Sequence, residues 1–564
     1  MQAAGRWILL GALLVFPAQI GAQAALPLKR APARTQTSIS PADLMTRLYM
    51  YADDSMMGRE AGTAYNLKAT EYIAAEARRL KLVPGGDSGT YFQNVPLVSR
   101  ALDASSAITI EGTSLKAWDD FVPRDPGRAT RPFDGAQTIY AGVWPDSNMI
   151  GAEQAAGKFV VLGAHSGDVP LAQQINRGAI LARYRTAAGI AVVALETFPQ
   201  PAIAFFRQPQ MTLRDATPSP TDTVSIPVYI YVAAPTAGLM FGAPLDSVKV
   251  GTLGKAVRGS VSFSDTPAPA RNVVAILPGS DPRLKAEYVA IGAHSDHVGS
   301  DGTSADHDSL RAYNDAVRRL QNAAPDHQVS QAQLQQIRVN MDSIRAARSG
   351  GAARRDSIFN GADDDGSGTT AVLEIAEAFA GARVKPKRSL IFVWHTAEEL
   401  GLFGARYFTD HPTVSRDSIV AQLNMDMVGR GRADDENGGG AGYLQLIGTR
   451  RLSTELGDLI ETVNKARRQP FTFDYQYDAS GHPEQFYCRS DHYMYARYGI
   501  PIAFFTTGGH RDYHQVTDEP QYIDYDKLTN VSQFVYDVAL AVANLDHRVV
   551  VDKPKPNPRG QCVQ

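Results

Sequence analysis

The arrangement of apolar and polar residues divides the chain into distinct regions. In residues 69–82, apolar side chains recur every three to four positions, which predicts an amphipathic helix. From about residue 107 to residue 265, short apolar runs are broken by Pro and Gly, and this pattern predicts a smaller strand-rich domain with one helix at residues 181–188. The strands predicted there are residues 158–162, 190–195 and 226–232. Two prolines within residues 264–270 indicate a hinge at its end.

From residue 271 onward, short apolar strands alternate with amphipathic helices. The predicted strands are residues 272–277, 288–293, 389–395, 419–425 and 502–506. The predicted helices include residues 369–380, 453–466 and 528–545. This alternation over more than 200 residues predicts an α/β fold, with a mostly parallel sheet flanked by helices on both faces. Residues 300–360 break the alternation with a polar segment, partly helical over residues 330–348, which we interpret as an insertion or lid.

The N-terminus has the features of an export signal. Arg6 precedes an apolar run at residues 7–16, which is too short to cross a bilayer core of about 30 Å. The small-x-small pattern at residues 22–24 predicts cleavage after Ala24, the alternative being an uncleaved membrane anchor. No other stretch reaches 18 apolar residues, so we expect an exported protein, periplasmic or secreted, that does not stay attached to a membrane.

Composition narrows the chemistry. The 564 residues hold 56 Lys and Arg against 59 Asp and Glu, with a net charge of -3 and no basic tract, which argues against nucleic acid as a partner. Only two cysteines are present, Cys488 and Cys562, which excludes a Cys-rich zinc or iron–sulfur site. They could pair in an oxidising compartment, although their spacing does not require it. A bound metal would therefore need His, Asp and Glu ligands.

Polar residues gather at the ends of the predicted strands, where open α/β sheets place their sites. The five groups are His294, Asp296 and His297; Asp363, Asp364 and Asp365; His395, Glu398 and Glu399; Asp426; and Asp512 and His514. Each group alone has an ordinary structural explanation, such as a core histidine or aspartates that cap a helix. Five of them in one domain favour a shared site.

Several other site types are excluded by their motifs. The chain has no HExxH zinc motif, and residues 363–365 lack the alternating ligands of an EF-hand loop. The Gly-rich residues 438–442 lack the Lys-Ser/Thr ending of a phosphate-binding loop, and no G-x-S-x-G elbow occurs in the α/β region. Imidazole and carboxylate ligands suit zinc, and two zinc ions about 3.5–4 Å apart need a bridging carboxylate. A further carboxylate beside them, not a ligand itself, would be a natural general base.

These motifs resemble those of the co-catalytic di-zinc exopeptidase family, which includes secreted bacterial leucyl aminopeptidases, aminopeptidase Y and glutamate carboxypeptidase. The matching segments are GAHSDHVG at the end of residues 272–299, GADDDGSG (361–368), HTAEELGLFGARYF (395–408), NMDMVGR (424–430), RSDH (489–492) and GGHRDYH (508–514). The strand-rich region at residues 107–265 resembles the protease-associated domain that several members carry. The resemblance covers nearly the whole chain after the export signal.

The resemblance implies a role for each matching residue. It implies a zinc site made by His294, Asp364 and Asp426, and a second made by Asp364, Glu399 and His514. Asp364 would bridge the two ions, because the family places the bridging Asp four residues before the final Gly of its motif, and an unusual cis peptide follows it. Glu398 would be the general base, and Asp296 would orient the site.

Other residues are weaker predictions. Tyr513 and Tyr487 are candidates to stabilise a developing oxyanion. The remaining histidines of these motifs are expected to be structural or to support the ligands; they are His297, His395, His492 and His510. The 300–360 insertion departs from the family, whose members usually have a short loop there.

The implied organisation follows from these matches. The expected segments are a signal peptide at 1–24, the first part of a peptidase domain at 25–106, the protease-associated-like domain at 107–265, the di-zinc peptidase domain at 271–548 and a C-terminal tail at 549–564. The implied function is an aminopeptidase with two Zn²⁺ per chain and peptide substrates. Three alternatives stay open: a carboxypeptidase of the glutamate type, a one-zinc glutaminyl cyclase, and a non-catalytic receptor. A carboxypeptidase would need cations near the substrate carboxylate, for which Arg430, Arg432 and Arg489 are available.

Overall fold

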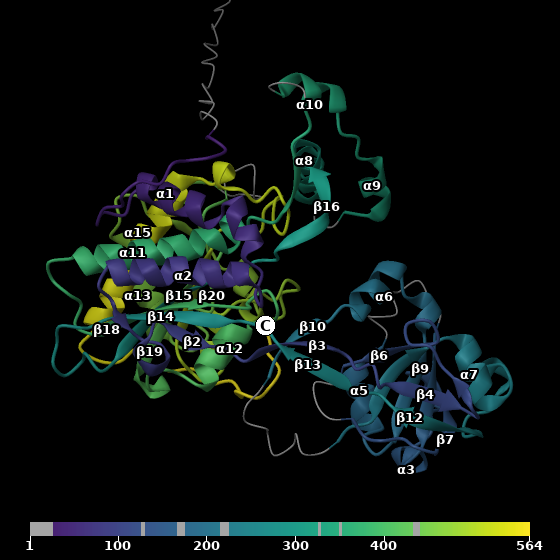
Figure 1. The fold of residues 1–564 in the computed structure, drawn as a ribbon. Coiled ribbons are helices and arrows are strands. Elements are labelled where there is room, and N and C mark those ends of the chain that lie inside the picture. Colours follow the sequence, from purple (N-terminus) through teal and green to yellow (C-terminus); the bar gives the residue numbers. More distant parts are fainter. Residues whose placement is uncertain are drawn as a thin grey trace, which may run out of the picture.

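Two large β-sheets organise the chain, and a small three-stranded sheet connects them (Figure 1). The structure is a computed structural model that describes residues 26–125, 130–165, 175–214, 225–324, 329–348, 352–431 and 440–564. The predicted signal peptide at residues 1–24 lies outside this part of the chain. Within it, no helix is both long and apolar enough to cross a membrane.

The larger sheet has nine strands, in the order β1-β14-β18-β15-β19-β22-β20-β21, with β2 paired to β14 as well. Their bounds are β1 Val83–Pro84, β2 Phe92–Asn94, β14 Arg271–Leu277, β15 Tyr288–His294, β18 Ser389–His395, β19 Ile419–Met425, β20 Tyr443–Ile447, β21 Thr472–Asp474 and β22 Ile502–Thr506. The four central strands β18, β15, β19 and β22 are parallel, whereas β14 and β20 join their neighbours in the centre antiparallel. All five strands predicted for this region form, and the α/β class is confirmed.

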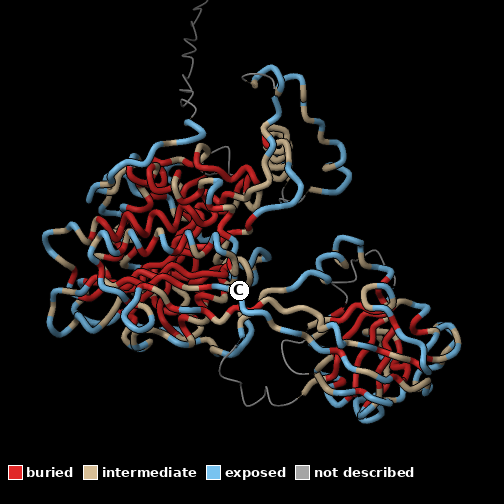
Figure 2. The backbone as a smooth tube through the Cα atoms, in the orientation of Figure 1, coloured by how far each residue is buried: buried red, intermediate tan, exposed pale blue. Residues whose placement is uncertain are grey.

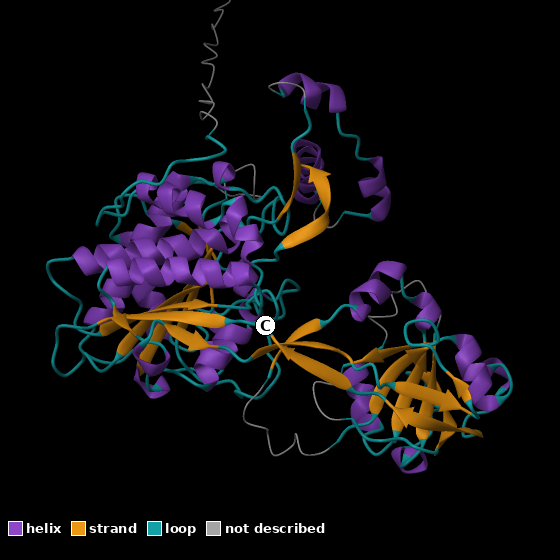
Figure 3. Ribbon diagram, viewed as in Figure 1, coloured by secondary structure: helices purple, strands orange, loops and turns teal. Residues whose placement is uncertain are grey.

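Helices cover both faces of this sheet (Figure 3), as expected for central strands that are apolar throughout. One face carries α1 Pro41–Tyr51, α2 Ala64–Arg79, α11 Gly368–Gly381, α13 Thr454–Lys465 and α15 Tyr525–Asn544. The other carries α12 Phe403–Asp410 and α14 His492–Ala496. Buried residues fill the space between these helices and the sheet (Figure 2). The N-terminal helices α1 and α2 thus complete the core of the larger unit.

The second large sheet has eight strands and its own core, in the order β5-β4-β12-β7-β8-β9-β11-β6. Their bounds are β4 Ala107–Ile110, β5 Thr113–Ser114, β6 Phe121–Arg124, β7 Ala136–Trp144, β8 Phe159–Ala164, β9 Gly189–Val193, β11 Val228–Val232 and β12 Leu253–Ser260. Among the described residues of this part, the α-helices are α3 Ala152–Ala155, α5 Arg177–Arg183, α6 Gln200–Arg207 and α7 Ala234–Phe241.

Two predictions for residues 107–270 differ from the structure. The helix predicted at residues 181–188 is α5, which spans Arg177–Arg183; the Tyr184 backbone leaves the helical conformation, and the Ala188 amide donates to the Lys158 carbonyl. The predicted hinge at 264–270 is largely strand: β13 (Phe263–Pro267) pairs with β3 (Leu97–Leu102), which also pairs with β10 (Gln210–Leu213). The connection between the two large sheets is therefore a three-stranded sheet.

The insertion at residues 300–360 is an arm with its own helices (Figure 1). It begins and ends with the paired strands β16 (Ser300–Asp306) and β17 (Arg355–Ile358). Between them lie α8 (His307–Ala323), α9 (Gln331–Gln336) and α10 (Met341–Ala347). The helix predicted at residues 330–348 is thus two short helices, and α8, the longest helix of the arm, was not predicted.

Candidate functional site

The five polar segments meet at one edge of the larger sheet, where the carboxyl ends of the parallel strands lie. His294 is the last residue of β15, and Asp426 directly follows the end of β19. Glu398 and Glu399 follow β18, and His514 lies in the loop after β22. Asp364 lies in the short helical segment Ala362–Ser367, which leads directly into α11. Segments far apart in the sequence therefore supply one site.

Asp364 lies between two groups of potential metal ligands. Its Oδ1 lies 3.1 Å from His294 Nε2, and its Oδ2 lies 3.0 Å from His514 Nε2. The peptide bond that follows it, to Asp365, is cis. Each carboxylate oxygen of Asp364 thus faces a different histidine, which is the arrangement a bridging carboxylate needs.

The first group contains His294, Asp364 and Asp426. His294 Nε2 lies 3.7 Å from Asp426 Oδ1, and Ser490 donates a 2.7 Å hydrogen bond to the other Asp426 oxygen. Asn424 in turn donates to Ser490 Oγ, which fixes the hydroxyl. Ser490 was not predicted to support the site, although it belongs to the RSDH motif.

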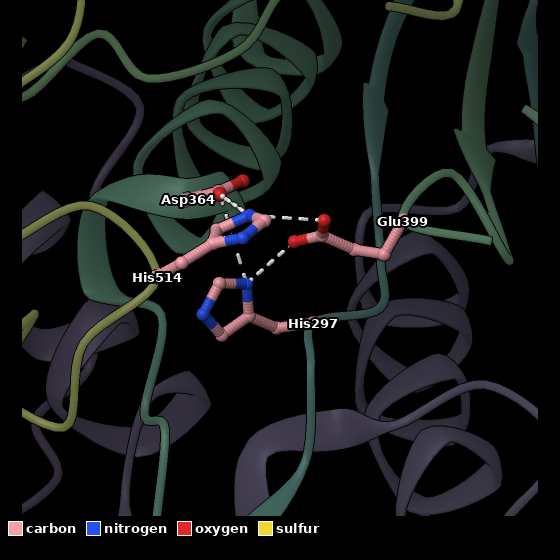
Figure 4. Close-up of side chains that lie close together, drawn as sticks. All are labelled: His297, Asp364, Glu399 and His514. Carbon is pink, nitrogen blue, oxygen red and sulfur yellow. Dashed lines mark hydrogen bonds and ion pairs between the residues drawn. The ribbon is translucent and has the colours of Figure 1, made fainter. Parts of the chain in front are cut away.

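The second group contains Asp364, Glu399 and His514, with His297 beside it (Figure 4). His514 Nε2 lies 3.1 Å from Glu399 Oε2, whereas His297 Nδ1 lies 2.7 Å from Glu399 Oε1. Because His297 holds one oxygen of Glu399 and leaves the other beside His514, its position suits support of a ligand. His297 is also near enough to be a ligand itself, at 3.8 Å from Asp364 Oδ2.

Asp296 contacts residues of both groups. Its fully buried carboxylate accepts hydrogen bonds from the Glu398 and Glu399 amides and lies 3.7 Å from His294 Nδ1. His294 Nδ1 also lies 3.1 Å from the Asp296 carbonyl oxygen. The imidazole is thereby oriented with Nε2 toward Asp364. Asp296 is close to both histidine and glutamate segments, as an orienting residue must be.

The two other aspartates of the triplet, Asp363 and Asp365, accept hydrogen bonds from main-chain amides. Asp365 accepts hydrogen bonds from the amides of His294, Gly368 and Met427, so its oxygens tie three site segments together. Asp363 accepts from the Gly429 amide and lies 3.2 Å from His510 Nε2. Although an Asp365 oxygen is close enough to His294 and Asp426 to count as a possible ligand, only Asp364 has both oxygens facing histidine nitrogens.

Further buried polar residues support these segments. Asp518 was not predicted; its carboxylate accepts hydrogen bonds from the amides of Asp363 and Asp364. His395 Nδ1 lies 3.1 Å from Asp491 Oδ2, and the His492 ring stacks on Phe504. No motif in the sequence distinguishes Asp518 from an ordinary surface aspartate, because its partners are main-chain amides.

The carboxylates give the site an excess of negative charge, which bound cations would compensate. Burial opposes ionisation of Asp364, yet hydrogen bonds from His294 and His514 hold its pKa well below the usual range. Burial lowers the pKa of His514, but Asp364 and Glu399 outweigh it and raise this pKa to about 10. A set of imidazoles and carboxylates with excess negative charge fits zinc ions.

Glu398 belongs to neither group but faces the same space. In the part of the chain that the structure describes, its carboxylate makes no hydrogen bond or ion pair. Burial raises its pKa well above the usual range, and although His294 opposes this, Asp426 and Glu399 raise it further. A carboxylate in this environment is suited to accept and return a proton.

A cavity of about 610 Å³ opens onto the site. Carboxylates from both groups and Glu398 line it on one side, and its apolar lining residues include Leu402, Met427, Phe486 and Phe504. Tyr513 also lines it; its ring stacks on His514, and its hydroxyl lies 3.3 Å from Arg489 Nη2.

Tyr487 is not brought to the cavity. Its ring is buried in the core, with Arg451 over one face and Tyr493 against its edge, because Tyr487 belongs to a short helical turn that packs inward. The neighbouring Cys488 lines the cavity and is joined by a disulfide to Cys562 near the C-terminus, which answers the open question of pairing.

The arginines available to a carboxypeptidase are dispersed. Arg430 is buried, 3.0 Å from Asp512 Oδ2, and does not line the cavity. Arg489 lines it but is 3.4 Å from Glu484 Oε2. Arg432 lies outside the described residues. Arg489 is therefore the one described member of the three that faces the cavity, and an acidic partner accompanies it.

Comparison with known proteins agrees with these motifs. Residues 272–539 match the model of peptidase family M28. The chain is 44% identical over 77 residues to leupeptin-inactivating enzyme 1 of Streptomyces exfoliatus (13% of this chain, 18% of that protein) and 29% identical over 196 residues to leucine aminopeptidase 1 of Ajellomyces capsulatus strain NAm1 / WU24 (32% and 48%). The chain thus spans less than half the length of these curated relatives.

Solved structures with a similar arrangement include an aminopeptidase from Aneurinibacillus sp. strain AM-1, which is 16% identical and has a TM-score of 0.46 over 92% of this chain and 97% of that one. A zinc aminopeptidase from Bacillus subtilis is 17% identical, with a TM-score of 0.44 over 89% and 95%. The family match covers every residue of the two ligand groups and Glu398. Over residues 272–539, the chain is therefore similar to peptidase family M28.

Proposed function

We propose that this chain is a zinc-dependent exopeptidase that removes the N-terminal residue of peptides, with two Zn²⁺ per chain. The observation that carries the proposal is the position of Asp364, whose Oδ1 lies beside His294 Nε2 and whose Oδ2 lies beside His514 Nε2. One zinc would be held by His294, Asp364 and Asp426, and the other by Asp364, Glu399 and His514. Bound there, the zinc ions would supply Lewis-acid activation of water and of the peptide carbonyl.

The remaining steps fall to residues of this chain. Glu398 takes a proton from the attacking water, whose oxygen bonds to the carbonyl carbon, and returns the proton to the nitrogen as the C–N bond breaks. The Tyr513 hydroxyl donates to the carbonyl oxygen as charge develops on it. The acidic groups Glu398 and Asp426 face the space where a protonated α-amine would bind.

The relatives support the choice of substrate end. Several curated relatives are named leucine aminopeptidase 1, and the apolar wall of the cavity suits an apolar first side chain. We also propose that residues 107–265 are a protease-associated domain and that the protein is exported, with cleavage after Ala24. The Cys488–Cys562 disulfide supports export, because disulfides persist in oxidising compartments.

The purified protein should hold close to two zinc ions per chain. The two proposed ligand groups share only Asp364, and its two oxygens face different histidines, so each group can retain an ion. Elemental analysis after dialysis measures the ratio. One tightly held ion, with no gain in activity when zinc is added, would contradict the proposal and favour a one-zinc glutaminyl cyclase.

The substrate end is tested with one peptide in three forms: free, N-acetylated and C-amidated. Acetylation removes the charge that the acidic groups bind, so we expect it to abolish cleavage, whereas amidation should be tolerated. Chromatography of the products measures both. The reverse pattern would indicate a carboxypeptidase, and Arg489→Met would then be expected to weaken binding of free peptides.

A further inference from the structure

Helix α8 of the inserted arm contacts the loop that carries Tyr513 and His514. Arg311 Nη1 lies 2.7 Å from Asp512 Oδ2, and Arg318 donates a 3.1 Å hydrogen bond to the Gly509 carbonyl. Asp315, one turn along the same helix, pairs with Arg511. Three side chains of one helix thus contact residues 509–512, which directly precede Tyr513 and the candidate zinc ligand His514.

Asp512 is the central residue of these contacts. Its side chain is fully buried, and its Oδ2 lies near Arg311 from the arm, Arg430 from the segment after β19 and, at 3.7 Å, the adjacent Arg511. A buried carboxylate is costly unless cations compensate it, so Asp512 depends on both sides for its position. Arg311 also stacks over the Tyr522 ring at 3.4 Å, which limits its own freedom.

The base of the arm is fixed to the same region of the domain. The Phe359 amide donates to the Gly299 carbonyl, and Arg354 lies 2.7 Å from Glu519 Oε1. Gly299 closely follows His297 in the sequence, and Glu519 directly follows Asp518, which holds the Asp363 and Asp364 amides. The arm is therefore anchored next to the segments that supply both ligand groups.

We propose that α8 is a positioning element for the site, in which Arg311, Asp315 and Arg318 hold residues 509–512 so that Tyr513 and His514 face Asp364 and Glu399. The roles of Tyr513 in catalysis and of His514 in zinc binding rest on the proposed function. The arm then acts on the catalytic step and on retention of one zinc ion, and not primarily on entry of substrate. This distinguishes it from a lid, whose removal would change KM first.

A charge exchange between Asp315 and Arg511 tests the proposal. In the metal-free protein, Asp315→Arg and Arg511→Asp should each speed amide hydrogen exchange in residues 508–514 by about 2- to 100-fold, the range that coupling between contacting residues spans. The double variant Asp315→Arg/Arg511→Asp should restore slow exchange. Failure of the double variant to restore it, or single variants with unchanged exchange, would overturn the proposal.

Arg311→Met tests the link to the site in the full-length zinc-loaded protein. We expect one of two zinc ions to be lost faster to a chelator and kcat to fall with little change in KM, while Arg311→Lys retains part of both. The matched control is Arg345→Met, which removes an exposed arginine of the same arm that pairs only with its neighbour Asp342 among the described residues. Circular dichroism verifies that each variant folds.

These measurements separate the inference from the proposed function. If the unmodified protein cleaves no peptide, the exchange and zinc-loss results still decide whether α8 positions the loop. If it cleaves peptides and Arg311→Met changes KM alone, α8 is a lid and the positioning role is wrong. If Arg345→Met matches Arg311→Met, the effect belongs to the arm's overall stability and the proposal also fails.

Discussion

Replacement of Glu398 with Gln is expected to lower kcat by at least about 100-fold while both zinc ions stay bound. The substitution keeps the size of the side chain and removes its ability to accept a proton, and general acid–base catalysis contributes at least about that factor. Glu398 lines the cavity yet belongs to neither ligand group, so its loss should not release metal. Steady-state kinetics and elemental analysis of the same sample measure the two quantities.

The neighbouring Glu399 provides the informative comparison. Glu399→Gln should release zinc, because Glu399 Oε2 faces His514 Nε2 at 3.1 Å within the second ligand group. Glu455→Gln, on α13 and paired with His547, is the control for a neutralised glutamate outside the site. If Glu398→Gln releases metal and Glu399→Gln does not, the roles of the two glutamates are exchanged.

The arrangement of the larger sheet could be predicted because its strands are short apolar runs with polar residues at their ends. Parallel strands bring their carboxyl ends to one edge, so His294, Asp426 and the Glu398–Glu399 pair had to lie near one another. The antiparallel pairing of β14 and β20 was not predictable in the same way, since hydrophobic periodicity carries no strand direction.

Residues that act through the backbone could not be distinguished from the sequence. Asp363, Asp364 and Asp365 are chemically identical neighbours, and only their hydrogen bonds separate a residue that faces two histidines from two that bind main-chain amides. The family resemblance selected Asp364 by its spacing to Gly368. Asp518 had no such signal, because amide partners leave no pattern in the side chains that contact it.

Long-range contacts account for the other differences. The predicted hinge forms β13 because β3, far away in the sequence, supplies the hydrogen-bonding partner, and Arg100 pairs with Asp265 across the two strands at 2.6 Å. Helix α8 is rich in charged residues and was missed as a helix, since its side chains Arg311, Asp315 and Arg318 have their partners in the main domain. Tyr487 lies beside a site motif in sequence and still packs into the core.

Asp364→Asn is expected to remove zinc from both positions and reduce activity to the background of metal-free protein. An amide offers a single carbonyl oxygen, whereas Asp364 presents Oδ1 to His294 and Oδ2 to His514. Removal of even a supporting partner of a ligand typically costs 10- to 100-fold in metal affinity, and a shared ligand should cost at least about that at each position. Zinc titration followed by calorimetry measures both affinities.

The comparison with single-group ligands makes this result specific. Asp426→Asn removes an oxygen from one group only, so it should weaken one zinc ion and leave the other near its original affinity. Asp458→Asn, an exposed aspartate of α13 paired with Arg450, should change neither. If Asp364→Asn instead weakens a single ion, as Asp426→Asn does, Asp364 does not bridge. His297, whose Nδ1 already lies beside Glu399, would then have to replace Asp364 as a ligand in the second group.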